Sequence, residues 1–193
     1  MNERRTYKIL FSILRPLQLL LFPIRQKGRE QIPEGACIIC TNHSSIVDPV
    51  LLAMAMTKKH HPRFMAKIEI ARVPVLGWLL KKAGMFFVDR GAGDVGAIRK
   101  ALALLKSGEM VMIFPEGTRV GDEDAVAAKS GAVRLAAKLG VPIIPAYIER
   151  KKKLFRRNRV TIGQPYYIDK TDVDYDARAQ ELMEKIYALE SVQ

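Results

Sequence analysis

The sequence predicts an α/β fold, a single domain in which helices flank a mainly parallel mixed sheet. Short apolar runs alternate along the chain with longer amphipathic stretches, the order that strand–helix–strand units produce. Glycine follows several of the amphipathic stretches, where helices commonly end. The chain has 193 residues, 49% of them hydrophobic and 27% charged, which is enough apolar material for one compact domain with its own core.

Each element is placed by a local pattern. The first helix of the domain begins near Asp48-Pro49, because an acidic residue followed by proline is a common helix start. Gly84, Gly108 and Gly140 each follow a helix. Pro145 predicts an edge strand or a bulge, since proline has no N–H for a neighbouring strand. We expect strands at 36–41, 63–67, 85–89, 110–114, 142–148 and 159–168, and helices at about 48–56, 74–83, 94–107, 130–139 and 175–190.

Residues 1–26 form a separate region, because they are both basic and strongly apolar. Pro16 predicts a break that divides this region into two short helices. The apolar positions are too crowded for a narrow packing stripe, which favours an amphipathic helical membrane anchor over a terminal helix packed on the core. The domain proper is then 27–193. No run of about 20 apolar residues is present to cross a bilayer, and Arg15 disfavours a signal peptide. We therefore expect a peripheral or monotopic protein at the cytoplasmic face of the cell membrane.

The charge balance predicts an anionic partner. Lys and Arg number 32 against 20 Asp and Glu, so the formal net charge is +12, which would attract nucleic acid, anionic lipid, or an acidic protein or substrate. The run at 150–159 (RKKKLFRRNR) is either a solvated loop or a second lipid-facing patch. Cys37 and Cys40 are too few for a disulfide scaffold, and they point to opposite faces of a strand, so we expect buried structural thiols.

The segment 42–48 (NHSSIVD) links the first strand to the first helix of the domain. If that helix begins at Asp48, the loop can fold His43 back onto the Asp48 carboxylate. A carboxylate on one imidazole nitrogen fixes the tautomer that a general base needs. Three plainer interpretations stay open: Asp48 as a helix cap, Ser45 and Asp48 as a capping box, and His43 as an ordinary loop histidine.

Two further strand ends deliver arginine side chains. FPEGTR (114–119) follows one expected strand, and GMFFVDR (84–90) contains another. Ligands bind at the carboxyl ends of strands in α/β sheets, and arginine offers a bidentate fork for phosphate or carboxylate. Gly117 lets the backbone approach a ligand closely, and Thr118 adds a hydroxyl donor. The alternative is a turn with a surface ion pair.

Four blocks in this order resemble the glycerolipid acyltransferase family, especially its 1-acylglycerol-3-phosphate acyltransferases. Members carry N-H-x-x-x-x-D, G-x-x-F-I-D-R, F-P-E-G-T-R-S and V-P-[IV]-x-P. Here the blocks read NHSSIVD (42–48), GMFFVDR (84–90), FPEGTR (114–119) and VPIIP (141–145), so the resemblance covers about 36–148. The chain departs from the family at Val120 and Ala128, where serine and phenylalanine are usual, and its loop 120–128 is more acidic, which leaves the exact acceptor open.

The resemblance implies an O-acyltransferase. It would move a fatty acyl group from an acyl thioester, on coenzyme A or acyl carrier protein, to the sn-2 hydroxyl of 1-acylglycerol 3-phosphate, giving phosphatidate. His43 would be the general base and Asp48 its orienting partner, with no Ser or Cys nucleophile and no metal or redox cofactor. The implied partners are the donor, a lysophospholipid acceptor and an anionic membrane surface, with no nucleic acid. The residues implied around the acceptor's glycerol phosphate are Arg90, Glu116, Gly117, Thr118 and Arg119.

Three alternatives stay open. Another acceptor, glycerol 3-phosphate or a lyso-aminolipid, would suit the same motifs. A non-catalytic basic module for anionic lipid or nucleic acid would suit the charge, although aromatic residues at 7% leave little for base stacking. GAGDVG (91–96) spells the G-x-G-x-x-G pattern of a dinucleotide site with Glu116 beyond it, but Asp89-Arg90 separates the glycines from their strand.

Overall fold

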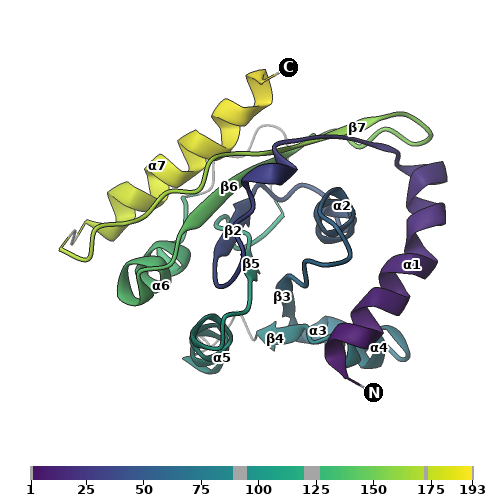
Figure 1. Cartoon of the computed structure of the whole chain (residues 1–193), viewed down its shortest axis with the longest axis horizontal. Coiled ribbons are helices and arrows are strands. Elements are labelled where there is room, and N and C mark those ends of the chain that lie inside the picture. The colour runs from purple at the N-terminus through teal and green to yellow at the C-terminus, as the bar shows by residue number, and fades with distance from the viewer. Residues whose placement is uncertain (1, 89–94, 120–126, 172–173, 193) are drawn as a thin grey trace.

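A seven-stranded sheet forms the centre of the computed structural model, which describes residues 2–88, 95–119, 127–171 and 174–192 (Figure 1). In spatial order the strands are β1 (Ile24–Lys27), β7 (Asn158–Ile162), β6 (Ile143–Ile148), β2 (Ile38–Thr41), β5 (Val111–Ile113), β3 (Arg63–Lys67) and β4 (Phe86–Val88). Every neighbouring pair is parallel except β6 and β7. The predicted single α/β domain with a mainly parallel mixed sheet is confirmed.

Helices cover both faces of the sheet, which makes three layers (Figure 1). One face carries α5 (Val95–Lys106), α6 (Gly131–Leu139) and α7 (Tyr175–Ala188). The other carries α1 (Glu3–Leu21) and α2 (Asp48–Ala55), with α3 (Ile68–Ala71) and α4 (Leu76–Lys82) nearby. Short 3-10 turns at Arg29–Gln31 and Leu189–Ser191 complete the described elements.

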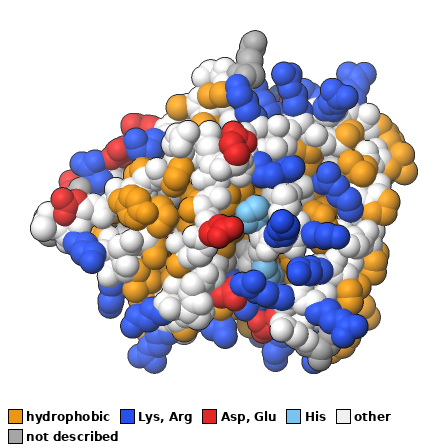
Figure 2. Space-filling model, in the orientation of Figure 1, with side chains coloured by type: hydrophobic (Ala, Val, Ile, Leu, Met, Phe, Trp, Pro, Cys, Tyr) orange, Lys and Arg blue, Asp and Glu red, His pale blue; other side chains and the backbone are white. Residues whose placement is uncertain are grey.

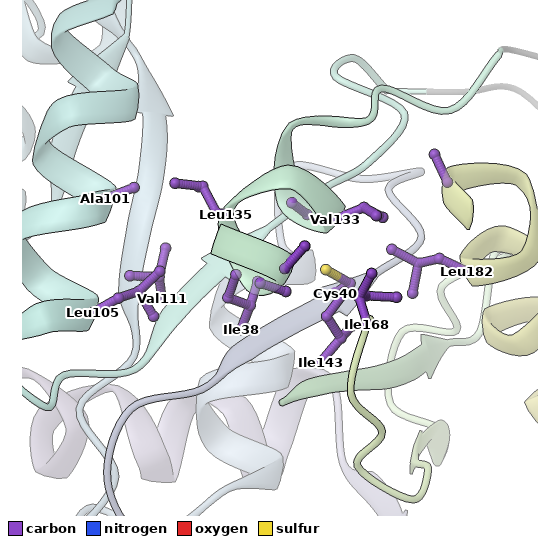
Figure 3. Packing of buried hydrophobic residues seen from close by; sticks show 14 of the residues in the cluster. Ile38, Cys40, Ala101, Leu105, Val111, Val133, Leu135, Ile143, Ile168 and Leu182 are labelled. Atoms are coloured by element: carbon purple, nitrogen blue, oxygen red, sulfur yellow. The ribbon is translucent and has the colours of Figure 1, made fainter. Parts of the chain in front are cut away.

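The central strand β2 contributes side chains to the hydrophobic clusters on both faces of the sheet. Ile38 and Cys40 point into the cluster formed with α5, α6 and α7 (Figure 3). Cys37 and Ile39 point to the opposite face, against α1 and α2. Alternation along a strand makes this division, and burial on both faces explains why the run is continuously apolar. The predicted placement of the two free cysteines on opposite faces is confirmed.

The N-terminal region differs from its prediction, because α1 is one continuous helix with Pro16 inside it. Proline removes one helical donor, but hydrogen bonds around it hold both halves in line. Arg15 donates to the Met54 carbonyl of α2 at 2.8 Å, and the Gln18 amide donates to the Phe22 carbonyl at 2.6 Å. The predicted division into two helices at Pro16 is therefore wrong.

Of the two places predicted for Pro145, an edge strand or a bulge, the structure excludes the edge strand. Pro145 sits within β6, which pairs with β2 on one side and β7 on the other, so the strand is not an edge strand. The Gly163 N–H donates to the Pro145 carbonyl one residue beyond the end of β7. The hydrogen bond that Pro145 cannot donate would therefore lie at the end of the β6–β7 ladder, where its absence destabilises the sheet least.

Some element bounds also change. β1 and α3 were not predicted, and β7 ends at Ile162, with only an isolated bridge between Ile143 and Tyr166 beyond it. The strand β1 is only four residues long, IRQK, and alternates half-buried and exposed positions without an apolar pattern. Pairing with β7, rather than local propensity, makes it a strand.

The outer surface of α1 is apolar. Figure 2 shows hydrophobic side chains along the right-hand edge of the molecule, where Figure 1 places this helix. Its exposed large apolar side chains are Ile9, Ile13, Leu14, Leu17, Leu19 and Leu20, the last 64% exposed. The inner side holds Tyr7 in the core. No helix among the described residues combines the length and apolarity needed to cross a bilayer.

Candidate active site

Two segments meet at the carboxyl edge of the sheet. The loop 42–47 leaves β2, and the segment 114–119 leaves β5, its parallel neighbour. Because both strands run in the same direction, their following segments emerge side by side. The His43 ring stacks on the Phe114 ring with 4.0 Å between centroids and an interplanar angle of 25°, which fixes the plane of the imidazole.

The structure brings His43 and Asp48 together, as a helix that begins at Asp48 allows. His43 Nδ1 lies 3.0 Å from Asp48 Oδ2. A carboxylate can only accept, so Nδ1 carries the proton and Nε2 presents its lone pair. Among the described residues no hydrogen-bond partner faces Nε2, and the His43 side chain is partly exposed. An imidazole held in this way can accept a proton from a bound hydroxyl.

Asp48 is fully buried, and its carboxylate holds the loop. Oδ2 also accepts from the backbone N–H groups of Ser44 and Ser45, at 2.8 and 2.7 Å. No capping box forms, because the helix N-cap is Val47 and not Ser45, and the Asp48 N–H donates to the Ser45 carbonyl rather than to its hydroxyl. Asp48 begins α2, as predicted. Its carboxylate accepts from N–H groups of the preceding loop and not from those of the helix, so the interpretation of Asp48 as a helix cap is wrong.

Neighbouring groups favour the ionised form of Asp48. Burial by itself would raise the pKa of this carboxyl, but the hydrogen bond with His43 and the ammonium of Lys152 outweigh it, so the pKa lies below its ordinary value. Lys152 Nζ lies 2.6 Å from Asp48 Oδ1. Asp48 is therefore a carboxylate at neutral pH, able to steady an imidazolium.

Glu116 supports the same loop from the neighbouring strand. Its Oε2 accepts from the His43 backbone N–H at 2.8 Å, and its Oε1 accepts from the Tyr187 hydroxyl of α7 at 2.7 Å. Burial raises the pKa of Glu116 more than these two bonds lower it. Only 3% exposed, Glu116 faces the loop, where the sequence resemblance had placed it against the acceptor.

Of the other residues implied for the acceptor, Gly117 is partly exposed and Thr118 and Arg119 lie at the surface. Gly117 has φ +69°, in the left-handed region that favours glycine, and a Cβ there would also displace the end of the Lys129 side chain. Thr118 and Arg119 follow it and are exposed. Arg90, and with it the Asp89-Arg90 strand end and most of the 91–96 glycine pattern, lies outside the described residues.

Three side chains at the site were not singled out from the sequence. Tyr187 belongs to a helix that carries no family motif, and Lys152 lies within the basic run at 150–159. Asn42 begins the motif, and its side chain exchanges two hydrogen bonds with the Ile148 backbone at the end of β6. A polar residue directly after a buried strand was the signal for Asn42, whereas the contacts of Lys152 and Tyr187 are made only by the fold. Within the described part of the chain, no three His, Cys, Asp or Glu side chains gather as a metal site.

Comparison with known proteins shows similarity to acyltransferases. The family model described as "Acyltransferase" matches residues 23–149. A 1-acyl-sn-glycerol-3-phosphate acyltransferase of Bacillus subtilis is 33% identical, in an alignment covering 83% of this chain and 82% of that protein. A lyso-ornithine lipid O-acyltransferase of Pseudomonas aeruginosa is 33% identical over 80% of this chain and 56% of its own length.

Other relatives are longer, and one solved structure shares the fold. The chloroplastic 1-acyl-sn-glycerol-3-phosphate acyltransferase BAT2 of Brassica napus is 30% identical, over 83% of this chain and 50% of that protein. This chain thus spans about half the length of the Brassica and Pseudomonas relatives. The crystal structure of PlsC, the 1-acyl-sn-glycerophosphate acyltransferase of Thermotoga maritima, superposes with a TM-score of 0.75 at 23% identity, over 98% of this chain and 79% of that one. The family model and the Bacillus relative together show that the chain belongs to the acyltransferase family that includes the 1-acyl-sn-glycerol-3-phosphate acyltransferases.

Proposed function

We propose that the protein transfers a fatty acyl group from an acyl thioester to the sn-2 hydroxyl of 1-acylglycerol 3-phosphate, giving phosphatidate. The observation that carries this proposal is the contact of His43 Nδ1 with the buried Asp48 carboxylate, which leaves Nε2 as the basic atom at the carboxyl edge of the sheet. The Bacillus relative's name supports the acceptor.

In the proposed reaction His43 Nε2 takes the proton of the acceptor hydroxyl while that oxygen attacks the thioester carbonyl. The tetrahedral intermediate then expels the thiolate, and the imidazolium returns the proton to it. Asp48 stays ionised throughout and stabilises the imidazolium through Nδ1–H. Oxygen forms one bond to the acyl carbon and sulfur loses one, so no covalent enzyme intermediate is required. General base catalysis of this kind is worth about 10²- to 10⁴-fold.

The acceptor's phosphate would lie beside the segment after β5. Gly117 brings the backbone close, and the exposed Thr118 and Arg119 provide a hydroxyl and a guanidinium fork for phosphate oxygens. Arg90 is proposed for the same phosphate on the sequence resemblance alone. Glu116, whose two oxygens are engaged inside the protein, would act by holding His43 in place.

We also propose that α1 docks the enzyme on the membrane that holds the acyl chains. The apolar outer side of α1 and a net charge of +12 support an interfacial helix on an anionic leaflet, and the cytoplasmic face of the cell membrane is the surface proposed. Because Tyr7 of this helix is in the core, residues 1–26 would anchor the protein and also pack against the domain at 27–193.

The test of the reaction is thiol release with product identification. The purified chain in detergent is given a long-chain acyl group as a thioester of either coenzyme A or acyl carrier protein, with and without 1-acylglycerol 3-phosphate. The lipid product is identified by mass spectrometry. The proposal predicts thiol release that depends on the acceptor and yields phosphatidate with at least one donor. Absence of phosphatidate with both donors would reject it.

A lyso-aminolipid is the second candidate acceptor, and the Pseudomonas relative's name is the observation that favours it. An aminolipid lacks the phosphate that Arg119 is proposed to bind. The same assay with lyso-ornithine lipid and with glycerol 3-phosphate separates the acceptors, because only the true acceptor accelerates thiol release.

The membrane proposal is tested without deleting α1, since deletion would expose the core. Replacing Ile13, Leu17 and Leu20 by serine should move the protein out of the bound fraction when it is sedimented with vesicles containing anionic lipid. Serine at Val95, Ile98 and Tyr167, which are also exposed but lie elsewhere, is the matched control. Equal binding of both triple variants would contradict docking through α1.

A further inference from the structure

Lys152 reaches the His43–Asp48 pair from the hairpin between β6 and β7. Its Nζ lies 2.6 Å from Asp48 Oδ1, donates to Ser44 Oγ at 2.8 Å and donates to the Glu149 carbonyl at 2.6 Å. The side chain is 7% exposed, whereas that of the next residue, Lys153, is 51% exposed. One cation of the basic run is therefore turned into the protein, so the run is not wholly a solvated loop or a lipid-facing patch.

The environment of Lys152 is that of a fixed charge. The ammonium donates to Ser44 Oγ and to the carbonyls of Glu149 and Arg150, and the Asp48 carboxylate is its counter-charge. Burying such a group is costly unless it is paired and hydrogen-bonded, and in return a buried pair is screened little by solvent or salt. A charge held next to Asp48 at this depth acts on the carboxylate far more strongly than an exposed lysine would.

The two oxygens of Asp48 make separate contacts. Oδ2 accepts hydrogen bonds from His43 Nδ1 and from the backbone N–H groups of Ser44 and Ser45, whereas Oδ1 forms the ion pair with Lys152. Lys152 thus fixes the carboxylate on the side away from the imidazole. It also donates to the hydroxyl of Ser44, so it ties the loop that carries His43 to the hairpin.

We infer that Lys152 is a positioning residue for the reaction: its ammonium holds the Asp48 carboxylate, offsets its charge and ties down the loop at Ser44, so that His43 is oriented to accept the hydroxyl proton. This inference rests on the proposed function. Without the ammonium, the full Asp48 charge would act on His43 and favour the imidazolium at higher pH. The other groups facing His43 are the Glu116 carboxylate with Arg150 and Tyr187 beside it, and a change at position 152 leaves them in place.

The test is the pH profile of acceptor-dependent thiol release in detergent micelles, where membrane docking plays no part. Lys152→Met should move the acid limb of kcat/KM upward by about one pH unit and lower kcat about tenfold. Lys152→Arg, which keeps the charge, should return the limb to its wild-type position. Lys153→Met is the matched control, because it removes the same charge from the same hairpin where the lysine pairs with Glu149 at the surface, and its profile should equal that of the wild type.

Folding is checked by circular dichroism, and the histidine is also observed directly. Should Lys152→Met not fold, Lys152→Gln keeps a donor for Ser44 and the Glu149 carbonyl and takes its place. In both the folded variant and the wild type, ¹⁵N NMR of labelled histidine follows protonation of His43, assigned from the spectrum of His43→Ala. The midpoint should rise in the variant by the same amount as the acid limb.

The outcomes separate the two proposals. If His43→Ala retains full acceptor-dependent release, the proposed function fails and this inference fails with it. If His43→Ala is inactive while the Lys152 variant shows the wild-type acid limb and NMR midpoint, only the inference about Lys152 is overturned. A shift of both readouts that Lys153→Met does not share supports it.

Discussion

The two segments at the carboxyl edge of the sheet are built in opposite ways. The loop after β2 turns its polar groups inward: Asn42 bonds to β6, His43 and Asp48 bond to each other, and Glu116 and Lys152 close the arrangement from other elements. The segment after β5 begins buried at Glu116 and then opens to solvent at Thr118 and Arg119. The proposed proton-transfer groups are thus set by folding, whereas the proposed acceptor-binding groups are free to adapt to a substrate.

The largest effect should come from changing the buried side of this comparison. Asp48→Asn removes the charge that steadies the imidazolium and leaves the Lys152 ammonium unpaired, so turnover should fall about 10²- to 10⁴-fold and stability by about 3 kcal/mol at pH 7. Steady-state kinetics and urea unfolding measure the two losses.

The stability loss in Asp48→Asn should depend on pH. Because the pKa of Asp48 is lowered in the folded protein, its stabilisation is present above the unfolded value near 3.9 and is lost as the pH falls through the folded value. The difference in unfolding free energy between wild type and Asp48→Asn should therefore shrink below about pH 4. A difference that stays constant on acidification would contradict the assigned charge.

A smaller effect is expected on the open side. Arg119→Ala should raise the KM for 1-acylglycerol 3-phosphate about tenfold, the loss of one charge-assisted contact, with little change in kcat or in stability. Arg134→Ala, at an exposed arginine on α6, is the control for loss of a surface cation. An unchanged KM in Arg119→Ala would remove this residue from the phosphate site.

The smallest effect should be that of Glu116→Gln on stability. Since burial raises the pKa of Glu116, ionisation of this group costs stability as the pH rises above its unfolded value near 4.3, and a neutral amide avoids that cost. Glutamine can accept from the His43 N–H and donate to the Tyr187 oxygen, so unfolding at pH 7 should change by less than about 1 kcal/mol. A loss of several kcal/mol would show that the negative charge itself holds the loop.

The sequence predicts contacts between neighbours in the chain better than contacts between distant segments. Alternation of apolar runs with amphipathic helices was enough to predict every strand of the sheet except β1, and a strand end followed by a helix start was enough to expect His43 near Asp48. Both rest on neighbours in the chain. The contacts of Tyr187 with Glu116 and of Lys152 with Asp48 join distant segments, and nothing in their local patterns distinguishes these residues from others on a helix or in a basic run.

The errors have the same origin. The helix break at Pro16 and the edge strand at Pro145 were predicted from the local effect of proline on backbone donors, whereas tertiary contacts decide both outcomes. Hydrogen bonds from Arg15 and Gln18 keep α1 continuous, and the end of β7 opposite Pro145 makes the missing donor harmless. β1 was missed because its pairing with β7, and not its own sequence, makes it a strand.

The most direct test of the central claim is the turnover of His43→Ala beside the wild type, measured as phosphatidate formed from the same thioester and 1-acylglycerol 3-phosphate, with the thermal midpoint of each protein recorded. Loss of the base predicts a fall of at least about 10²-fold in a protein that is still folded at the assay temperature, although loss of the bond to Asp48 lowers its midpoint. Phosphatidate formed by His43→Ala at the wild-type rate would contradict the claim that this histidine accepts the hydroxyl proton.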